Sequence, residues 1–157
     1  MANATSVSAS AHLDLEAFLP YRLSILANTV SNAIARDYHD RFGLTVPEWR
    51  VMAVLGRFGP EMATEICART AMDKVTVSRA MTRLIKRDLI TRTSDPRDRR
   101  RMIARLTRKG QSIHDKIVPV ATAHERNLLE ALGPGEAKAL DRLLAKLQDR
   151  ADTLSHG

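Results

Sequence analysis

Residues 72–110, with the sequence MDKVTVSRAMTRLIKRDLITRTSDPRDRRRMIARLTRKG, carry the strongest fold signal in this chain. Asp73 can cap a helix that runs through Arg87, in which apolar residues recur at helical spacing. Short strands are expected at 89–93 and 102–106, on either side of the arginine-rich loop 95–101. Thr107 then begins a new helix. The stretch therefore predicts a helix, a two-stranded hairpin with a basic tip, and a further helix.

The expected helix 74–87 has two different faces. At 100° per residue its apolar face consists of Val77, Ala80, Met81 and Leu84. Its outer face consists of Val75, Thr76, Arg79, Thr82, Arg83 and Lys86. The apolar face would dock on a core, and the outer face would remain free to enter a groove.

The residues before this stretch predict three more helices. The first spans 21–41, with Pro20 in its first turn and Gly43 at its end. The second spans 47–58; Thr45 caps it, and Glu48 stands three residues later as in a capping box. The third spans 62–69, with Ala63, Ile66 and Cys67 facing the core. Two helices joined by a short turn and followed by a hairpin form a winged helix-turn-helix.

The residues after the hairpin predict two helical segments, one from 107 to about 132 and one over 136–154. The fold class is thus mainly α with a small β-wing. We expect a disordered tail at 1–11, an N-terminal dimerisation arm at 12–44, a winged helix-turn-helix lobe at 45–112 and C-terminal dimerisation helices at 113–157. Helical arms with apolar stripes need a partner surface, and a two-fold dimer commonly supplies it. The alternative is that both arms cover one monomeric core.

The positive charge is concentrated in one segment. Residues 45–112 hold 16 basic and seven acidic side chains, a net charge of +9, whereas 1–44 and 113–157 each carry a net −1. Such concentration favours a polyanionic partner. Aromatic residues make up only 4% of the chain, so stacking platforms for single strands are few. Double-stranded DNA is the expected partner.

Several classes of protein are disfavoured. The first residues lack the basic start and apolar core of a signal peptide, and no apolar run approaches the roughly 20 residues of a membrane span. The single cysteine, Cys67, fits a reducing cytoplasmic setting, and its expected core position favours an inert thiol over a redox sensor. The sequence lacks phosphate loops, nucleophile elbows and clustered metal ligands. We therefore expect neither an enzyme nor a cofactor, and no metal site.

The chain resembles the MarR family of bacterial transcriptional regulators over nearly its whole length. The resemblance rests on Val75–Arg79 (VTVSR), Leu84–Ile90 (LIKRDLI), Asp95–Arg100 (DPRDRR) and Leu106–Gly110 (LTRKG). One departure is Asp88, where the family usually has glycine at a helix end. Asp tolerates the left-handed conformation better than most residues, so we expect the turn to be retained.

The resemblance, together with side-chain chemistry, assigns DNA contacts to the helix 74–87. Arg79 can bridge O6 and N7 of guanine in the major groove, or it contacts phosphate alone. Val75 and Thr76 can meet a thymine methyl group. Phosphate contacts are expected from Lys74, Ser78, Thr82 and Arg83 of this helix, and from Thr64 near the start of the expected helix 62–69.

The hairpin tip is the second expected DNA contact. By resemblance to the family, Asp98 pairs with Arg100 and stiffens the wing. Arg97 or Arg99 is then free to enter a narrow minor groove, and Arg101 completes the basic tip. The alternative is a solvated loop that makes diffuse contacts. A dimer would recognise an imperfect palindrome with half-sites about one helical turn apart.

Members of this family commonly release DNA when a small molecule binds. The stretches 18–24 (FLPYRLS), 47–51 (PEWRV) and 71–75 (AMDKV) resemble a branch of the family that senses hydroxycinnamoyl-CoA thioesters. This resemblance implies a repressor of hydroxycinnamate catabolism that leaves its operator on binding an aryl-CoA thioester. The candidate effector residues are Arg22, Ser24, Asn28, Trp49 and Arg50. Arginine would bind a carboxylate or a CoA phosphate, and Trp49 would pack against the aromatic ring of the ligand.

Alternatives remain for the effector and for its candidate residues. The effector could be a free phenolic acid, or the protein could bind DNA without any effector. Trp49 could be a core residue, and Arg50 could form an ion pair with Glu48 or Asp37.

Overall fold

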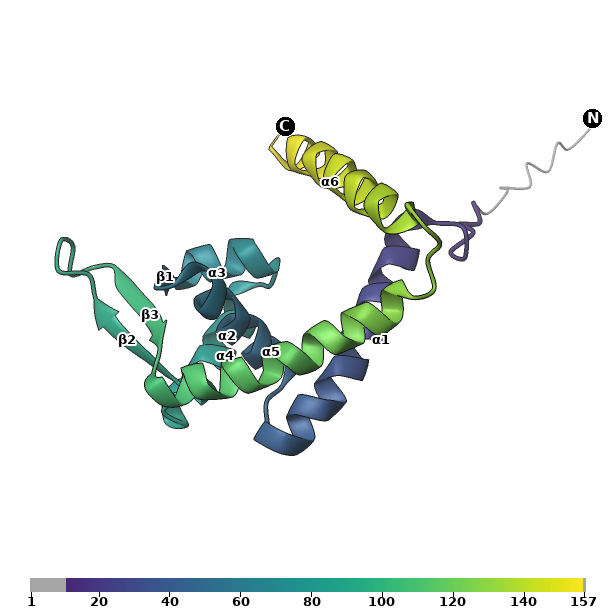
Figure 1. Cartoon of the computed structure of the whole chain (residues 1–157). Coiled ribbons are helices and arrows are strands. Elements are labelled where there is room, and N and C mark those ends of the chain that lie inside the picture. Colours follow the sequence, from purple (N-terminus) through teal and green to yellow (C-terminus); the bar gives the residue numbers. More distant parts are fainter. Residues whose placement is uncertain (1–10, 157) are drawn as a thin grey trace, which may run out of the picture.

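The computed structural model describes residues 11–156, so the tail expected at 1–11 lies almost entirely outside the described residues. Helices dominate, and one small sheet carries the hairpin (Figure 1). The elements are α1 (Leu19–Phe42), α2 (Val46–Phe58), β1 (Glu61–Met62), α3 (Ala63–Thr70), α4 (Lys74–Lys86), β2 (Ile90–Ser94), β3 (Met102–Leu106), α5 (Arg108–Leu129) and α6 (Glu136–Ser155).

Side-chain caps determine where three of the helices begin. The hydroxyl of Thr45 accepts the N–H of Glu48, and the Glu48 carboxylate accepts the N–H of Thr45 at 3.2 Å. Asp73 accepts the N–H of Thr76 at 2.8 Å at the start of α4. Thr107 accepts the N–H of Gly110 at 2.9 Å at the start of α5. These caps satisfy N–H groups that have no partner inside a helix, and they confirm the predicted starts.

The sheet has the order β1-β3-β2, and both pairs are antiparallel. The hairpin register pairs Ile90 with Leu106 and Ser94 with Met102, as expected for the two predicted strands. Strand β1 was not predicted, because it is only two residues long and forms by pairing with β3. The turn at Asp88 has φ 56°, which confirms the predicted left-handed conformation.

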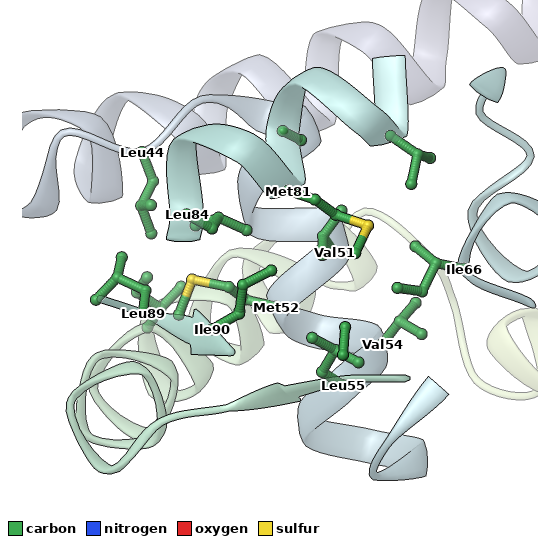
Figure 2. Packing of buried hydrophobic residues seen from close by; sticks show 14 of the residues in the cluster. Leu44, Val51, Met52, Val54, Leu55, Ile66, Met81, Leu84, Leu89 and Ile90 are labelled. Carbon is green, nitrogen blue, oxygen red and sulfur yellow. The ribbon is translucent and has the colours of Figure 1, made fainter. Parts of the chain in front are cut away.

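Helix α2 runs through the centre of the core and is covered by α3, α4, α5 and β3. All four predicted inner residues of α4 are buried: Val77, Ala80, Met81 and Leu84. Figure 2 shows Met81 and Leu84 beside Val51 and Met52 of α2. Burial of each larger apolar side chain contributes about 1.5–3 kcal/mol, so this face fixes α4 firmly and leaves its other face outward.

Apolar side chains at the two ends of the described chain are exposed, unlike those of the core. Helix α5 packs along α1, whereas α6 stands apart from the other helices (Figure 1) and has no buried residue. Large apolar side chains are exposed on α6 and on the first turns of α1: Leu19, Tyr21, Leu23, Ile25, Leu26, Leu140, Leu143, Leu144, Leu147 and Leu154. Among residues 11–156, no helix has the length and apolar character needed to cross a bilayer.

Candidate nucleic-acid interface and neighbouring cavity

The outer face of α4 carries an exposed row of polar and basic side chains. Lys74, Ser78 and Arg79 lie on it, and Val75 is 57% exposed although it is apolar. Within residues 11–156, the side chain of Arg79 forms no hydrogen bond or ion pair. Its guanidinium is therefore available for an external acceptor.

Two candidate DNA contacts on α4 already use their hydroxyl groups. Thr76 donates to the second carboxylate oxygen of Asp73 at 2.9 Å, and Thr82 donates to the carbonyl of Ser78 at 2.9 Å. Thr76 is half-buried and Thr82 is exposed. The methyl groups of both threonines are left for apolar contacts. Thr64, in the first turn of α3, is also exposed.

The wing is an ordered hairpin whose tip is built around two aspartates. Asp95 accepts the main-chain N–H of Arg97 at 2.9 Å, and its own N–H donates to the carbonyl of Arg101 at 2.7 Å. The tip projects away from the helices (Figure 1). All four of its arginines are exposed: Arg97, Arg99, Arg100 and Arg101.

Asp98 contacts Arg100, but through the main chain. Its carboxylate accepts the backbone N–H of Arg100 at 3.1 Å, and no ion pair joins the two side chains in the described structure. The expected pairing of charged side chains is corrected to a turn-stabilising hydrogen bond. Arg101 donates through Nε to the sulfur of Met62 at 3.2 Å, whereas the guanidinium groups of Arg97, Arg99 and Arg100 form no hydrogen bond or ion pair within residues 11–156.

A buried carboxylate lies at the other end of α4, and it was not foreseen from the sequence. Glu48 is 3% exposed, and its Oε1 lies 3.7 Å from Nη1 of Arg83. Its Oε2 lies 4.0 Å from Nη1 of Arg87. Arg87 also donates to the carbonyls of Phe42 and Gly43 at the end of α1. The capping-box pattern identified Glu48 as a cap, but its arginine partners depend on the tertiary fold.

A small cavity of about 120 Å³ lies between α1 and α2. It is lined by Ser31, Ile34, Tyr38, Val46, Trp49 and Arg50. Arg50 donates to the hydroxyl of Ser31 at 3.3 Å. The alternative that Arg50 pairs with Glu48 or Asp37 is wrong, because Glu48 pairs with Arg83 and Arg87, and Asp37 lies 2.6 Å from Nε2 of His124.

Aromatic rings form one wall of this cavity. The Trp49 ring lies 5.9 Å from the Tyr38 ring and 5.6 Å from the imidazole of His114. Trp49 is half-buried and packs against the core, so it is both a core residue and a cavity wall. Burial raises the pKa of Tyr38 to about 12, although the nearby Arg50 acts in the opposite direction. The Tyr38 hydroxyl thus stays protonated at neutral pH and remains a hydrogen-bond donor.

The other three candidate effector residues do not line this cavity. Arg22, Ser24 and Asn28 are exposed on the first half of α1. Arg22 lies nine residues before Ser31, about 13 Å along the helix axis. It instead borders an open groove of about 620 Å³ on α1. A third hollow, of about 690 Å³, includes Arg36 and His39 and shares Val46 with the small cavity.

Comparison with known proteins gives a consistent result. Residues 42–101 match the model of the MarR family. The HTH-type transcriptional repressor NicR of Pseudomonas putida is 32% identical over 106 residues, which cover 68% of this chain and 67% of NicR.

Solved structures agree in fold. A MarR/EmrR family transcriptional regulator from Acinetobacter sp. ADP1 superposes with a TM-score of 0.82 at 26% identity, over 90% of this chain and 99% of that one. Bordetella bronchiseptica BpsR, whose DNA binding is regulated by 6-hydroxynicotinic acid, superposes with a TM-score of 0.77 at 25% identity, over 88% and 99%.

Proposed function

The chain belongs to the MarR family and is a DNA-binding transcriptional regulator of that family, and we propose that it is a dimeric repressor released from a palindromic operator by an aromatic acid or its thioester. The observation that carries the DNA-binding part is the set of exposed arginines on α4 and the wing that form no ion pair within residues 11–156: Arg79, Arg97, Arg99 and Arg100. Arg79 is the residue proposed to read guanine, because it is exposed and unpaired on the face opposite the buried one.

The remaining proposed contacts position the protein on the duplex. Lys74, Ser78, Arg83 and Thr64 would meet phosphates, and Val75, Thr76 and Thr82 would offer methyl groups to the groove. The wing would place Arg97 or Arg99 in the minor groove, with Arg100 and Arg101 near the backbone. Each lost phosphate contact should lower the salt dependence of binding.

The proposed dimer rests on the exposed apolar surface at both ends of the chain. Leu140, Leu143, Leu144 and Leu147 form an exposed apolar stripe on α6, and the first turns of α1 carry a second apolar surface. A two-fold partner would bury both surfaces. It would also set two α4 helices into successive major grooves, about 34 Å apart. This surface argues against the alternative in which both arms simply cover a monomeric core.

The effector is proposed to bind in the cavity between α1 and α2. Its ring would lie against Trp49 and Tyr38, and its carboxylate would replace or join Ser31 as the partner of Arg50. An aromatic acid regulates DNA binding by BpsR, which supports this class of ligand for the present chain.

Cavity size bears on the choice between an acid and a thioester. A volume of about 120 Å³ is well below the roughly 300–1,000 Å³ that drug-sized ligands occupy. It is comparable to a cavity of about 150 Å³ that holds a single benzene ring, and it has no room for a nucleotide. A CoA thioester would need to extend from the ring site past Val46 into the hollow beside Arg36 and His39. The geometry thus favours the free acid, and the thioester remains the second candidate.

The test is fluorescence anisotropy of a labelled duplex from the region upstream of the protein's own gene. p-Coumaroyl-CoA, feruloyl-CoA, the two free acids and 6-hydroxynicotinic acid are added in turn. Release by an acid supports the proposed site, release by a thioester alone supports the second candidate, and release by none removes the effector assignment.

Two variants locate the ligand in that assay. Arg50→Gln should abolish the response while leaving operator affinity unchanged. Arg22→Gln, at the far end of α1, should respond like the wild type unless the ligand reaches that groove. Retained release by Arg50→Gln would move the site elsewhere.

A further inference from the structure

We propose that Glu48 is a positioning residue for DNA binding: its buried carboxylate holds the guanidinium of Arg83 where it meets a phosphate. The proposal rests on the phosphate contact assigned to Arg83 above. Glu48 is buried, and it lies on α2 rather than on α4, the helix proposed to enter the major groove.

The first argument is the burial of the Glu48 carboxylate. Its side chain is only 4% exposed, and a buried carboxylate requires hydrogen bonds and opposite charge to offset lost hydration. The N–H of Thr45 supplies one hydrogen bond at 3.2 Å. The remaining compensation comes from Arg83 and Arg87, both in the last turn of α4 or just after it. The carboxylate thus ties α4 to the start of α2.

The second argument is the different state of the two arginines. Arg87 is engaged by the protein, since it donates to the carbonyls of Phe42 and Gly43 as well as lying beside Glu48. The side chain of Arg83 is 63% exposed, and its guanidinium forms no hydrogen bond to another residue within 11–156. Its donors remain free, while Glu48 at 3.7 Å restrains it by charge alone. Of the two arginines beside Glu48, Arg83 is therefore the one whose guanidinium can contact a phosphate.

The third argument is the sign of the charge. A carboxylate close to a DNA surface repels phosphates, so a glutamate with no positioning role would weaken binding. Its removal would then strengthen binding. If Glu48 orients Arg83, its removal weakens binding instead, because Arg83 loses its preferred direction. The two roles therefore predict opposite outcomes for the same substitution.

The experiment is a double-mutant cycle of Glu48→Gln and Arg83→Ala, measured by anisotropy on an operator duplex over a salt series. Gln retains the capping-box acceptor for Thr45 and removes only the charge. Arg83→Ala should weaken binding about tenfold and reduce the salt slope by about 1. Glu48→Gln should weaken binding about threefold to fivefold, a small loss, because the Arg83 side of the pair is exposed to solvent and solvent screens the attraction. In the Arg83→Ala background it should have no further effect.

Glu61→Gln is the matched control. Glu61 is also a buried carboxylate, 6% exposed and paired with Arg69 at 2.9 Å, but neither residue lies on α4. It should leave operator affinity within about twofold of the wild type, the spread of distant and independent sites.

Each outcome decides the proposal. Stronger binding by Glu48→Gln, or an equal loss in both backgrounds, overturns it while leaving the phosphate contact of Arg83 intact. No effect of Arg83→Ala alone refutes the phosphate contact itself.

If Glu48→Gln lowers the melting temperature by more than a few degrees, Glu48→Asp is the second variant. It keeps the charge and withdraws the carboxylate by one carbon–carbon bond, so it should also weaken binding. Wild-type affinity of Glu48→Asp would contradict the positioning role.

Discussion

Replacement of Gly110 by alanine should destabilise the protein, even though alanine favours helices. Gly110 lies in the first turn of α5, where a Cβ atom would stand 1.9 Å from the carbonyl oxygen of Leu89 and 3.3 Å from Cδ2 of Leu106. Relief of that overlap requires α5 to move by more than about 1 Å, since ordinary contacts of this kind exceed 3.4 Å. The Leu89 carbonyl also accepts the N–H of Thr107 at 3.0 Å, so the movement breaks a bond at the junction of β3 and α5.

Opposing contributions determine the change in the free energy of unfolding of Gly110→Ala. Gain in helix propensity contributes up to about 1 kcal/mol. Overpacking costs about 1–3 kcal/mol, and the broken hydrogen bond costs about 1 kcal/mol more. The net loss of about 1–3 kcal/mol corresponds to a fall in Tm of about 3–10 °C for a chain of this length.

Thermal denaturation followed by circular dichroism measures this loss, with all variants at one protein concentration. Ser112→Ala, at an exposed position of the same helix, is the control and should match the wild type. A Tm for Gly110→Ala equal to or above that of the wild type would refute the close approach of α5 to Leu89.

Three further predictions concern the cap, the wing and the arms. Hydrogen bonds from Thr76 hold the pKa of Asp73 below its usual value, so the stability from this cap is present at neutral pH and is lost as the pH falls through that lowered pKa. Asp73→Asn keeps the cap, but its Tm should fall less than that of the wild type between pH 7 and pH 3. An equal fall in both proteins would contradict this. Asp98→Ala should weaken operator binding about fivefold by removing the hydrogen bond from the Arg100 N–H, whereas Asp98→Asn, which keeps an acceptor, should bind like the wild type. Equal losses of operator affinity in the two variants, measured by anisotropy, would exclude the turn as the cause. Leu144→Glu should yield a monomer in sedimentation velocity, and an intact dimer would place the partner surface elsewhere.

Much of the fold could be predicted because its signals are local. Thr45, Asp73 and Thr107 mark helix starts by their side-chain chemistry, and the inner face of α4 follows from spacing alone. Even the left-handed turn at Asp88 could be inferred from the single departure from a family pattern.

The features that sequence could not supply depend on contacts between distant segments. Strand β1 exists only because Glu61 and Met62 pair with β3. The partner of Arg50 proved to be Ser31, nineteen residues away, rather than a neighbouring acid. The same limit applies to Arg22, which belongs to the same helix as Ser31 but lies too far along it to share one small cavity.

The central claim, that α4 reads DNA sequence through Arg79, is tested most directly by Arg79→Ala. Anisotropy would compare the wild type and the variant on an operator duplex and on a scrambled duplex of equal length. Arg126→Ala, an exposed arginine near the end of α5, serves as the control for lost charge. The account predicts that discrimination between the two duplexes falls by about 1–3 kcal/mol. An equal loss of affinity for both duplexes would contradict it and make Arg79 a phosphate contact.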